Sequence, residues 1–160
     1  MIEIRPAVPD DAAVVTGLLR ALAETLGEGD TFRSTEALIR QHGFGPERRL
    51  WSMLAVAGAD AVGLATYFPT FSTTRGAPGV YVQDLYIVPE ARGRRLGQLL
   101  LTAVIRDAEA GWGAAHLTLL VYDKNDAARR FYRRLGFSLA DTERPALLDG
   151  AAFAALRGMP

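Results

Sequence analysis

Apolar positions along the chain recur with two different spacings, and the spacing separates the expected helices from the expected strands. Near the N-terminus they recur every three or four residues, at Val14, Val15, Leu18, Leu19, Leu22 and Leu26. This spacing predicts an amphipathic helix that begins at Asp10 or Asp11, both good N-cap residues, and ends in the glycine- and acid-containing run 27–30. A second, shorter helix, capped by Ser34, is expected to run through Ile39 and to stop near Gly43 and Gly45.

Strands are expected where apolar and polar residues alternate, or where β-branched and aromatic residues gather. Segments of this kind cover residues 2–5, 50–57, 61–71 and 80–88. A tight Gly-Ala-Asp turn joins the second segment to the third, and a polar loop over 72–79 joins the third to the fourth. The middle of the chain therefore reads as a run of antiparallel strands.

Beyond Pro89 the spacing returns to three and four residues. One helical face is formed by Leu96, Leu99, Leu100, Ala103, Val104 and Ala108, and this helix is expected to end near Gly111 and Gly113. The elements expected after it are a strand over 116–122, a helix over 125–135, strands over 137–140 and 144–148, and a short helix over 151–156.

The order of these elements predicts one α+β domain over residues 1–160, with a mixed, largely antiparallel sheet flanked by helices. The strands 80–88 and 116–122 are connected through a helix by a right-handed crossover, so they are expected to lie parallel and adjacent. No internal repeat, low-complexity tract or linker divides the chain.

Composition narrows the possible functions. Of the 160 residues, 49% are hydrophobic and 22% are charged, as in globular proteins. The 18 basic and 18 acidic residues give a formal net charge of zero, which argues against nucleic acid or a membrane as the partner. With no Cys and two His, the chain offers few metal ligands and no thiol nucleophile. A signal peptide and a membrane span are not evident, so a cytoplasmic location is expected.

A basic loop precedes the helix that follows Pro89. The segment PEARGRRLGQLL places Arg92, Arg94 and Arg95 around Gly93, directly ahead of that helix. A helix N-terminus presents unpaired N–H groups and the positive end of the helix dipole, which together bind phosphate. Arginines add charged hydrogen-bond donors. A solvated turn has a similar composition, so this segment alone leaves both interpretations open.

The segment NDAARRFYRRLGF forms a second cluster. It begins at Asn125, a good N-cap residue, and Phe131, Leu135 and Phe137 suit a hydrophobic core. Tyr132 differs from them because its hydroxyl needs a hydrogen-bond partner when it is buried. Tyr132 is therefore open to a chemical role as well as to a role in packing.

Together, VPEARGRRLGQLL and NDAARRFYRRLGF resemble the GNAT superfamily of acyl-CoA N-acyltransferases. The cofactor loop of that family usually reads Arg/Gln-x-x-Gly-x-Gly/Ala. Arg92 and Gly97 match it, and Arg95 stands where glycine is more usual. Arg95 is expected to have helical dihedrals in the first turn of the helix. The segments IRPAVPDD, VGLATYFPTFSTT and YVQDLYIVPE extend the resemblance over nearly the whole chain and are similar to the spermidine/spermine (diamine) acetyltransferase branch.

The resemblance implies an acetyl-CoA-dependent N-acetyltransferase without a metal, in which the strand 80–88 splays away from 116–122 and the pantetheine arm of CoA lies in the gap. Backbone groups of Leu85, Tyr86 and Ile87 are expected to pair with that arm. The N–H of Ile87 is expected to stabilise the oxyanion. The remaining cofactor contacts implied are Arg92, Gly93, Arg94, Arg95, Leu96, Gly97 and Gln98 for the phosphates, and Asn125, Ala127, Ala128 and Tyr132 for the rest of CoA.

By the same resemblance, the amine attacks the acetyl carbon directly, and Tyr132 is the general acid for the departing thiolate. A base or a water relay must take a proton from the incoming ammonium, and Asp84 and Glu28 are the candidate bases. The binding site for the acceptor amine is expected to be lined by Glu28, Tyr81, Gln83 and Asp84.

Strand alternation places Tyr81, Gln83, Leu85 and Ile87 on one face of the sheet, and Val82, Asp84, Tyr86 and Val88 on the other. A splayed strand is expected to carry a β-bulge, which would shift this alternation.

The identity of the acceptor stays open at this point. The diamine branch usually carries Glu where Gln83 stands and an acid near Leu26, so the acceptor site of this chain has fewer acidic residues to hold a polycation. A polyamine, a diamine and an amino-acid-like amine are the small-molecule candidates. The alternatives are acetylation of a protein N-terminus or lysine, and a non-catalytic acyl-CoA-binding module. Because many members of the family are homodimers, a homodimer is expected.

Overall fold

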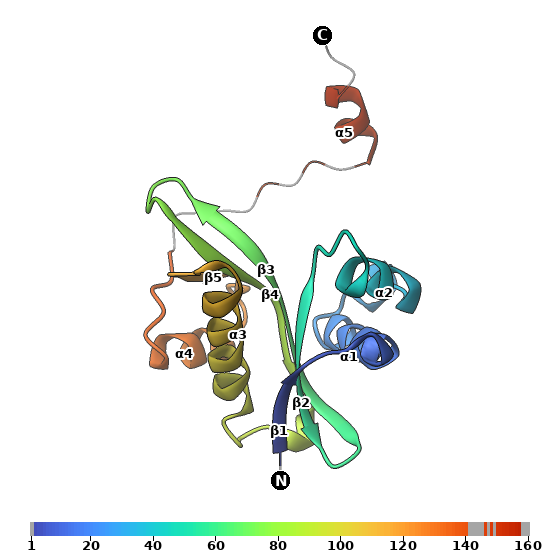
Figure 1. Ribbon diagram of the computed structural model, residues 1–160, viewed down its shortest axis with the longest axis vertical. Coiled ribbons are helices and arrows are strands. Elements are labelled where there is room, and N and C mark those ends of the chain that lie inside the picture. The colour runs from blue at the N-terminus through green and yellow to red at the C-terminus, as the bar shows by residue number, and fades with distance from the viewer. Residues whose placement is uncertain (1, 141–145, 147, 149, 158–160) are drawn as a thin grey trace. The chain divides into compact units, whose positions relative to one another are not determined.

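The computed structural model describes residues 2–140, 146, 148 and 150–157. Contacts within the chain group it into two compact units, one that ends at Leu120 and one that starts at Val121. The first unit holds the sheet, and the second holds two helices (Figure 1).

Among the described residues, the first unit contains a five-stranded sheet and three α-helices. In chain order these are β1 (Ile2–Pro6), α1 (Ala12–Thr25), α2 (Glu36–Phe44), β2 (Trp51–Ala57), β3 (Asp60–Ser72), β4 (Ala77–Ile87), α3 (Leu96–Trp112) and β5 (Leu117–Leu119). The strands lie in the order β1-β2-β3-β4-β5, and every neighbouring pair is antiparallel except β4 and β5, which are parallel. The predicted α+β class and parallel pair are confirmed.

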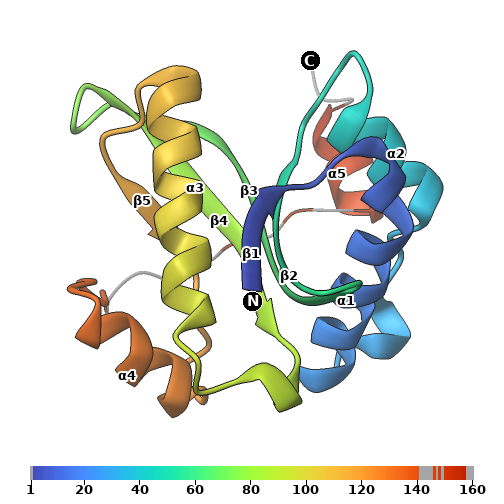
Figure 2. The same cartoon turned by 60° about the horizontal axis from the view of Figure 1, so that its bottom comes forward.

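Helices cover both faces of this sheet. Helices α1 and α2 lie against one face and α3 lies against the other, as Figures 1 and 2 show from two directions. Helix α1 buries Val15, Leu18 and Leu19, which pack with Leu54 and Leu64 of the sheet. The residues that α3 buries are Leu96, Leu100, Leu101, Val104 and Ala108. The three-to-four spacing of apolar residues thus places one stripe of each helix against the sheet.

The second unit contains α4 (Asp126–Arg134) and α5 (Gly150–Arg157). The expected strand over 137–140 is not formed, because Phe137 donates its N–H to the carbonyl of Tyr132 and closes the end of α4 instead. The expected strand over 144–148 falls largely outside the described residues.

The predicted helix boundaries need two corrections. Thr35, and not Ser34, caps α2, because its hydroxyl accepts a hydrogen bond from the N–H of Leu38 at 3.3 Å. Helix α2 ends at Phe44, between Gly43 and Gly45, where the sequence predicts its end. Asp11 precedes α1, but its carboxylate binds Arg5 instead of the helix N-terminus.

Two strand boundaries also differ from the prediction. Strand β4 begins at Ala77, so the loop expected over 72–79 is reduced to a short turn between two long strands. Strand β5 is shorter than the predicted 116–122. The side chain of Leu120, directly after it, is 66% exposed because the chain has already left the sheet.

Strand β4 carries the bulge expected from the sequence. Thr66 pairs with Asp84 but the next residue, Tyr67, pairs with Val82, so Gln83 is an extra residue without a partner on β3. The side-chain alternation therefore changes phase at Gln83. Paired residues share a face, so Val82 lies on the α3 face with Tyr67, and Asp84 lies on the opposite face with Thr66. The expectation that Val82 and Asp84 share a face is wrong.

Candidate functional site

The outer edge of β4 is open over its second half. Strand β5 pairs only with residues 80–82, whereas β4 continues to Ile87. Among the described residues, no strand lies beside 83–87 on that edge. The two parallel strands therefore part where the bulge begins, which leaves room for an extended molecule to pair with β4.

The direction of the backbone groups on this edge follows from one hydrogen bond. Val88 donates its N–H to the carbonyl of Val62 at 3.1 Å, so this N–H points toward β3. Because N–H directions alternate along a strand, the N–H groups of Leu85 and Ile87 point to the open edge, and that of Tyr86 points toward β3. The open edge thus offers two backbone donors. Tyr86 is buried in the core by its side chain.

The basic loop connects this edge to α3. It is exposed, and the Nε of Arg92 donates a hydrogen bond to the carbonyl of Ile87 at 3.1 Å. Leu96 is buried and fixes the first turn of α3 against the sheet. The N-terminus of a long helix, with its unpaired N–H groups, therefore follows directly on the open strand edge, and three arginines stand before it.

The backbone of Arg95 differs from the expectation. It is left-handed, with φ of 59° and ψ of 15°, and Arg95 lies before the first turn of α3 as its N-cap residue. Among the described residues it is the one non-glycine residue with positive φ. This conformation costs an L-residue about 1–2 kcal/mol. The glycine more usual at this position avoids that cost, so Arg95 keeps the same backbone shape at the expense of stability.

A cavity of about 280 Å³ lies between α1, the segment after it, and β4. The residues that line it are Leu19, Leu22, Ala23, Leu26, Glu28, Phe32, Ser34, Ile39, Leu50, Gln83 and Asp84. This cavity brings together three of the four residues predicted for the acceptor site, Glu28, Gln83 and Asp84. Tyr81 does not line the cavity; its ring stacks on that of Phe68 with centroids 5.0 Å apart. We call this cavity the acidic cavity.

Asp84 has an unusual electrostatic environment in the acidic cavity. Burial raises the pKa of its carboxyl group, and the charge of Glu28 raises it further. The hydroxyl of Thr66, which is fully buried, donates a hydrogen bond to Asp84 and opposes this shift. A raised pKa makes Asp84 a stronger base than an exposed aspartate, which suits a group that accepts a proton from an amine.

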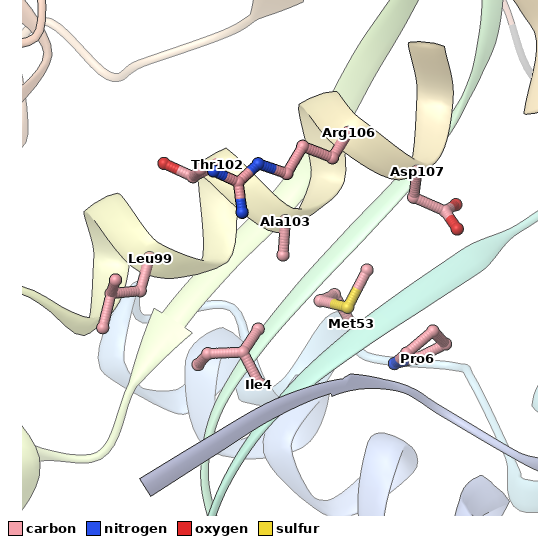
Figure 3. A pocket seen from close by; sticks show the side chains of 8 residues that line it. All are labelled: Ile4, Pro6, Met53, Leu99, Thr102, Ala103, Arg106 and Asp107. Atoms are coloured by element: carbon pink, nitrogen blue, oxygen red, sulfur yellow. The ribbon is translucent and has the colours of Figure 1, made fainter. Parts of the chain in front are cut away.

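A larger cavity, of about 460 Å³, lies on the other face of the sheet between β1, β2 and α3 (Figure 3). It is lined by Ile4, Pro6, Met53, Leu99, Thr102, Ala103, Arg106 and Asp107. The carboxylate of Asp107 accepts a hydrogen bond from the hydroxyl of Tyr67 at 2.7 Å. No residue that the sequence predicted for the site lines this cavity. We call it the α3 cavity.

The second unit presents the other predicted residues. The side chain of Asn125 caps α4 by accepting a hydrogen bond from the N–H of Ala128 at 3.0 Å. Tyr132 is 8% exposed and packs between Phe131 and Phe137. Burial raises the pKa of Tyr132 to about 12, so its phenol is protonated at neutral pH, as a general acid must be.

Sequence reasoning missed the part that Thr66 plays. Thr66 is one strand away from Asp84, and only the register of β3 against β4 brings their side chains together. Aligning the two halves of the hairpin around a bulge at Gln83 would have identified this pair. The apolar lining from Leu19, Leu22 and Ile39 was assigned to packing alone.

Two further properties hold for the residues that the structure describes. No group of three or more His, Cys, Asp or Glu residues is placed to hold a metal ion. Every α-helix is too short or too polar to span a membrane.

Comparison with known proteins identifies the family of this chain. Residues 17–137 match the model of the acetyltransferase (GNAT) family. The thialysine N-epsilon-acetyltransferase of Bos taurus is 30% identical over 141 residues, which cover 83% of this chain and 82% of that protein. The uncharacterized N-acetyltransferase YhfO of Bacillus subtilis is 28% identical over 134 residues, which cover 84% of this chain and 88% of that protein.

Solved structures show the same fold. An integron cassette protein from the mobile metagenome of V. cholerae superposes with a TM-score of 0.80 at 22% identity, covering 99% of this chain and 98% of that one. The overall fold is thus shared with a protein of very different sequence.

Proposed function

This chain belongs to the acetyltransferase (GNAT) family, and we propose that it moves the acetyl group of acetyl-CoA to the primary amine of a small molecule in the acidic cavity. That it is an acetyl-CoA-dependent N-acetyltransferase follows from the family. The observation that carries the choice of acceptor is the convergence of Glu28, Gln83 and Asp84 in one cavity beside the open half of β4. An ammonium is the partner that such carboxylates attract.

The open edge and the basic loop fit acetyl-CoA. In our proposal the pantetheine arm pairs with the backbone of Leu85 and Ile87, whose N–H groups face the open edge. The expected pairing with Tyr86 is dropped, because the backbone of Tyr86 points toward β3. The phosphates lie on the loop from Arg92 to Gln98, where the first N–H groups of α3 and the arginines are available. Asn125, Ala127 and Ala128, at the start of α4, contact the rest of CoA.

The proposed chemistry is direct transfer. The ammonium of the acceptor gives one proton to the carboxylate of Asp84, and the neutral amine attacks the acetyl carbon. The carbonyl electrons move to oxygen, where the N–H of Ile87 stabilises the charge. The carbonyl then re-forms as the C–S bond breaks, and the sulfur leaves with the bonding electrons as a thiolate. The second proton of the new amide nitrogen passes to this thiolate to give the thiol of CoA, and Asp84 releases the first proton to solvent. The products are the N-acetylated amine and CoA.

Tyr132 is the proposed general acid for the thiolate. Its raised pKa keeps the phenol protonated throughout the working range of pH. An alkyl thiol has a pKa of about 8.5, so a phenol of higher pKa stabilises the departing sulfur mainly through the hydrogen bond that it donates.

The relatives support a small acceptor. The mammalian relatives are named for acetylation of the ε-amine of thialysine. We therefore include polyamines, diamines and amino-acid-like amines in the acceptor class, and propose that neither a metal, nucleic acid nor a membrane takes part. We also propose that residues 1–160 form a single acetyltransferase domain, which acts as a homodimer in the cytoplasm. Sedimentation of the full chain tests the dimer.

Release of CoA, followed with a thiol reagent, tests the function directly. The chain has no Cys, so the enzyme itself gives no background signal. Acceptor-dependent release across spermidine, putrescine, thialysine, lysine and simple alkylamines is the expected result. Release with none of these amines, although acetyl-CoA binds, would instead indicate a macromolecular acceptor or a non-catalytic acyl-CoA-binding module.

A further inference from the structure

The acidic cavity has few polar side chains in its lining, and its two acids lie near one another. Its carboxylates belong to Glu28 and Asp84, which are close enough for the charge of Glu28 to raise the pKa of Asp84, and Gln83 lies next to Asp84 at the bulge. Asp84 and Gln83 adjoin the open half of β4, where Leu85 and Ile87 present their N–H groups. Apart from Ser34, the rest of the lining is an apolar wall that comes from Leu19, Leu22, Ala23, Leu26, Phe32, Ile39 and Leu50.

The lining contains no cation. Among the described residues that form the cavity wall, there is no Lys, Arg or His. The guanidinium of Arg20 lies 5.0 Å from the centroid of the Phe32 ring, on a side chain that lines the cavity, but Arg20 itself does not line it. A carboxylate bound inside would thus face Glu28 and Asp84 without a positive partner.

These two features act against different acceptors. A carboxylate on the acceptor loses its hydration and meets like charges, which is costly in a poorly solvated site. A second ammonium at the far end of the chain meets leucine, isoleucine and phenylalanine side chains, and it too loses water without gaining a partner. An apolar chain at the same place is stabilised by the area that it buries.

We propose that the preferred acceptor is a primary amine on an apolar chain that carries neither a carboxylate nor a second ammonium, that is, an alkylamine or arylalkylamine. This rests on the proposed function, because it takes the acidic cavity as the acceptor site. It ranks such amines above the polyamines, diamines and amino-acid-like amines that the proposed function also admits. The reacting amine lies beside Asp84 and Glu28, and the chain of the acceptor lies along the apolar wall.

The volume is compatible with such a molecule. At about 30 Å³ for each atom of the size of water, 280 Å³ holds about nine non-hydrogen atoms. Pentylamine and phenethylamine fit within this number. Cadaverine fits as well, and lysine exceeds it by only one atom, so charge and not size decides between these acceptors.

Three amines with the same five-carbon chain test the proposal. Pentylamine becomes cadaverine by the addition of a second amine, and cadaverine becomes lysine by the addition of a carboxylate. We expect kcat/KM from thiol release to fall about tenfold from pentylamine to cadaverine, and again by about tenfold to lysine. Cadaverine or lysine as the best of the three would overturn the proposal and leave the proposed function intact. Release with none of the three, nor with any polyamine, would contradict the proposed function itself.

A variant of the apolar wall provides the second test. Leu26 lines the cavity and is 37% exposed, so Leu26→Glu adds a charge to the apolar wall without burying that charge fully. We expect this variant to raise kcat/KM for cadaverine relative to pentylamine by about tenfold, since the second ammonium gains a partner. Leu26→Gln, which adds polarity without charge, should leave the ratio near that of the wild type.

Leu38→Glu is the matched control. Leu38 is 43% exposed on α2 and does not line the cavity, so the ratio of the two amines should be unchanged. An unchanged ratio in folded Leu26→Glu, or an equal shift in Leu38→Glu, would show that the apolar wall does not select the acceptor. Circular dichroism of each variant establishes that it is folded.

Discussion

The two cavities of the first unit lie on opposite faces of one sheet and differ in what surrounds them. The α3 cavity is the larger, at about 460 Å³, but its carboxylate on Asp107 is already bonded to Tyr67. The acidic cavity is smaller, at about 280 Å³. Its two acids, Glu28 and Asp84, are distant from each other in the sequence, and Asp84 lies on a bulged strand with an open edge. Volume alone would select the α3 cavity, whereas converging polar groups with a raised pKa favour the acidic cavity, which is the acceptor site of our proposal.

The largest difference between the cavities should appear when each loses its aspartate charge. Asp84→Asn removes the proposed base, and we expect kcat/KM to fall about 10²–10⁴-fold. Asp107→Asn keeps an acceptor for the hydroxyl of Tyr67, so activity should stay near that of the wild type. Steady-state rates with the best acceptor measure both. Equal losses in the two variants would remove the functional distinction between the faces.

Tyr132, in the second unit, lies outside both cavities and tests the chemistry separately. We expect Tyr132→Phe to lower kcat about 10²-fold, because the departing thiolate loses its donor. The affinity for acetyl-CoA, measured by calorimetry, should change much less. Tyr122→Phe removes the hydroxyl of a tyrosine in the same unit that is 56% exposed, and serves as the control. Unchanged turnover in Tyr132→Phe would exclude the acid role.

Larger side chains that fill one cavity at a time test which cavity binds the acceptor, without changing any charge. Ala23 lines the acidic cavity and Ala103 lines the α3 cavity, and both lie on helices. Ala23→Leu should raise KM for the amine about tenfold by occupying its space, with little change in KM for acetyl-CoA. Ala103→Leu should leave both constants unchanged. A raised KM for the amine in Ala103→Leu, with no change in Ala23→Leu, would instead indicate that the acceptor binds in the α3 cavity.

The raised pKa of Asp84 predicts opposite effects of pH on activity and stability. Activity requires the ionised carboxylate, so kcat/KM should fall as pH drops through this raised pKa. The folded state holds the proton more tightly than the unfolded state, so Asp84 destabilises the fold above that pKa and ceases to do so at lower pH. Asp84→Asn should therefore be more stable than the wild type at neutral pH, and the difference in Tm should shrink on acidification.

Removal of the neighbouring charge tests the cause of that shift. Because Glu28 raises the pKa of Asp84, Glu28→Gln should move the acidic limb of the kcat/KM profile to lower pH. Asp107→Asn, on the other face, should not move it. A limb that stays in place in Glu28→Gln would show that burial alone sets the pKa.

The smallest expected effect concerns the basic loop, which belongs to neither cavity. Arg95→Gly relieves a left-handed backbone that costs about 1 kcal/mol, and Tm should rise by about 2–4 °C. If the phosphates bind to backbone N–H groups, KM for acetyl-CoA should stay the same. Arg94→Ala, which lacks this strain, should show no such rise in Tm.

The sequence was sufficient for the features that depend on local spacing. Helices α1 and α3 and the hairpin follow from apolar period and turn residues, and the parallel pair follows from the crossover rule. The second segment of the family resemblance likewise led to α4 and its Asn125 cap, which the structure confirms.

Features that depend on the register between strands were harder to predict from the sequence. The left-handed backbone of Arg95 is set by how the loop leaves β4 and not by the preference of arginine. The pairing of Thr66 with Asp84, and the placement of Val82 on the α3 face, require the position of the bulge to be known. The alternation of one strand cannot reveal an extra residue that only its neighbour defines.

The bulge at Gln83 absorbs one extra residue, and this keeps Asp84 in register with Thr66 on the side of the sheet that faces the acidic cavity. If the same residues formed a regular strand from Val82 onward, Gln83 would pair with Thr66 and the carboxylate of Asp84 would point toward α3. In design, a strand that keeps every acid unchanged could therefore gain or lose the acidic lining through its register alone.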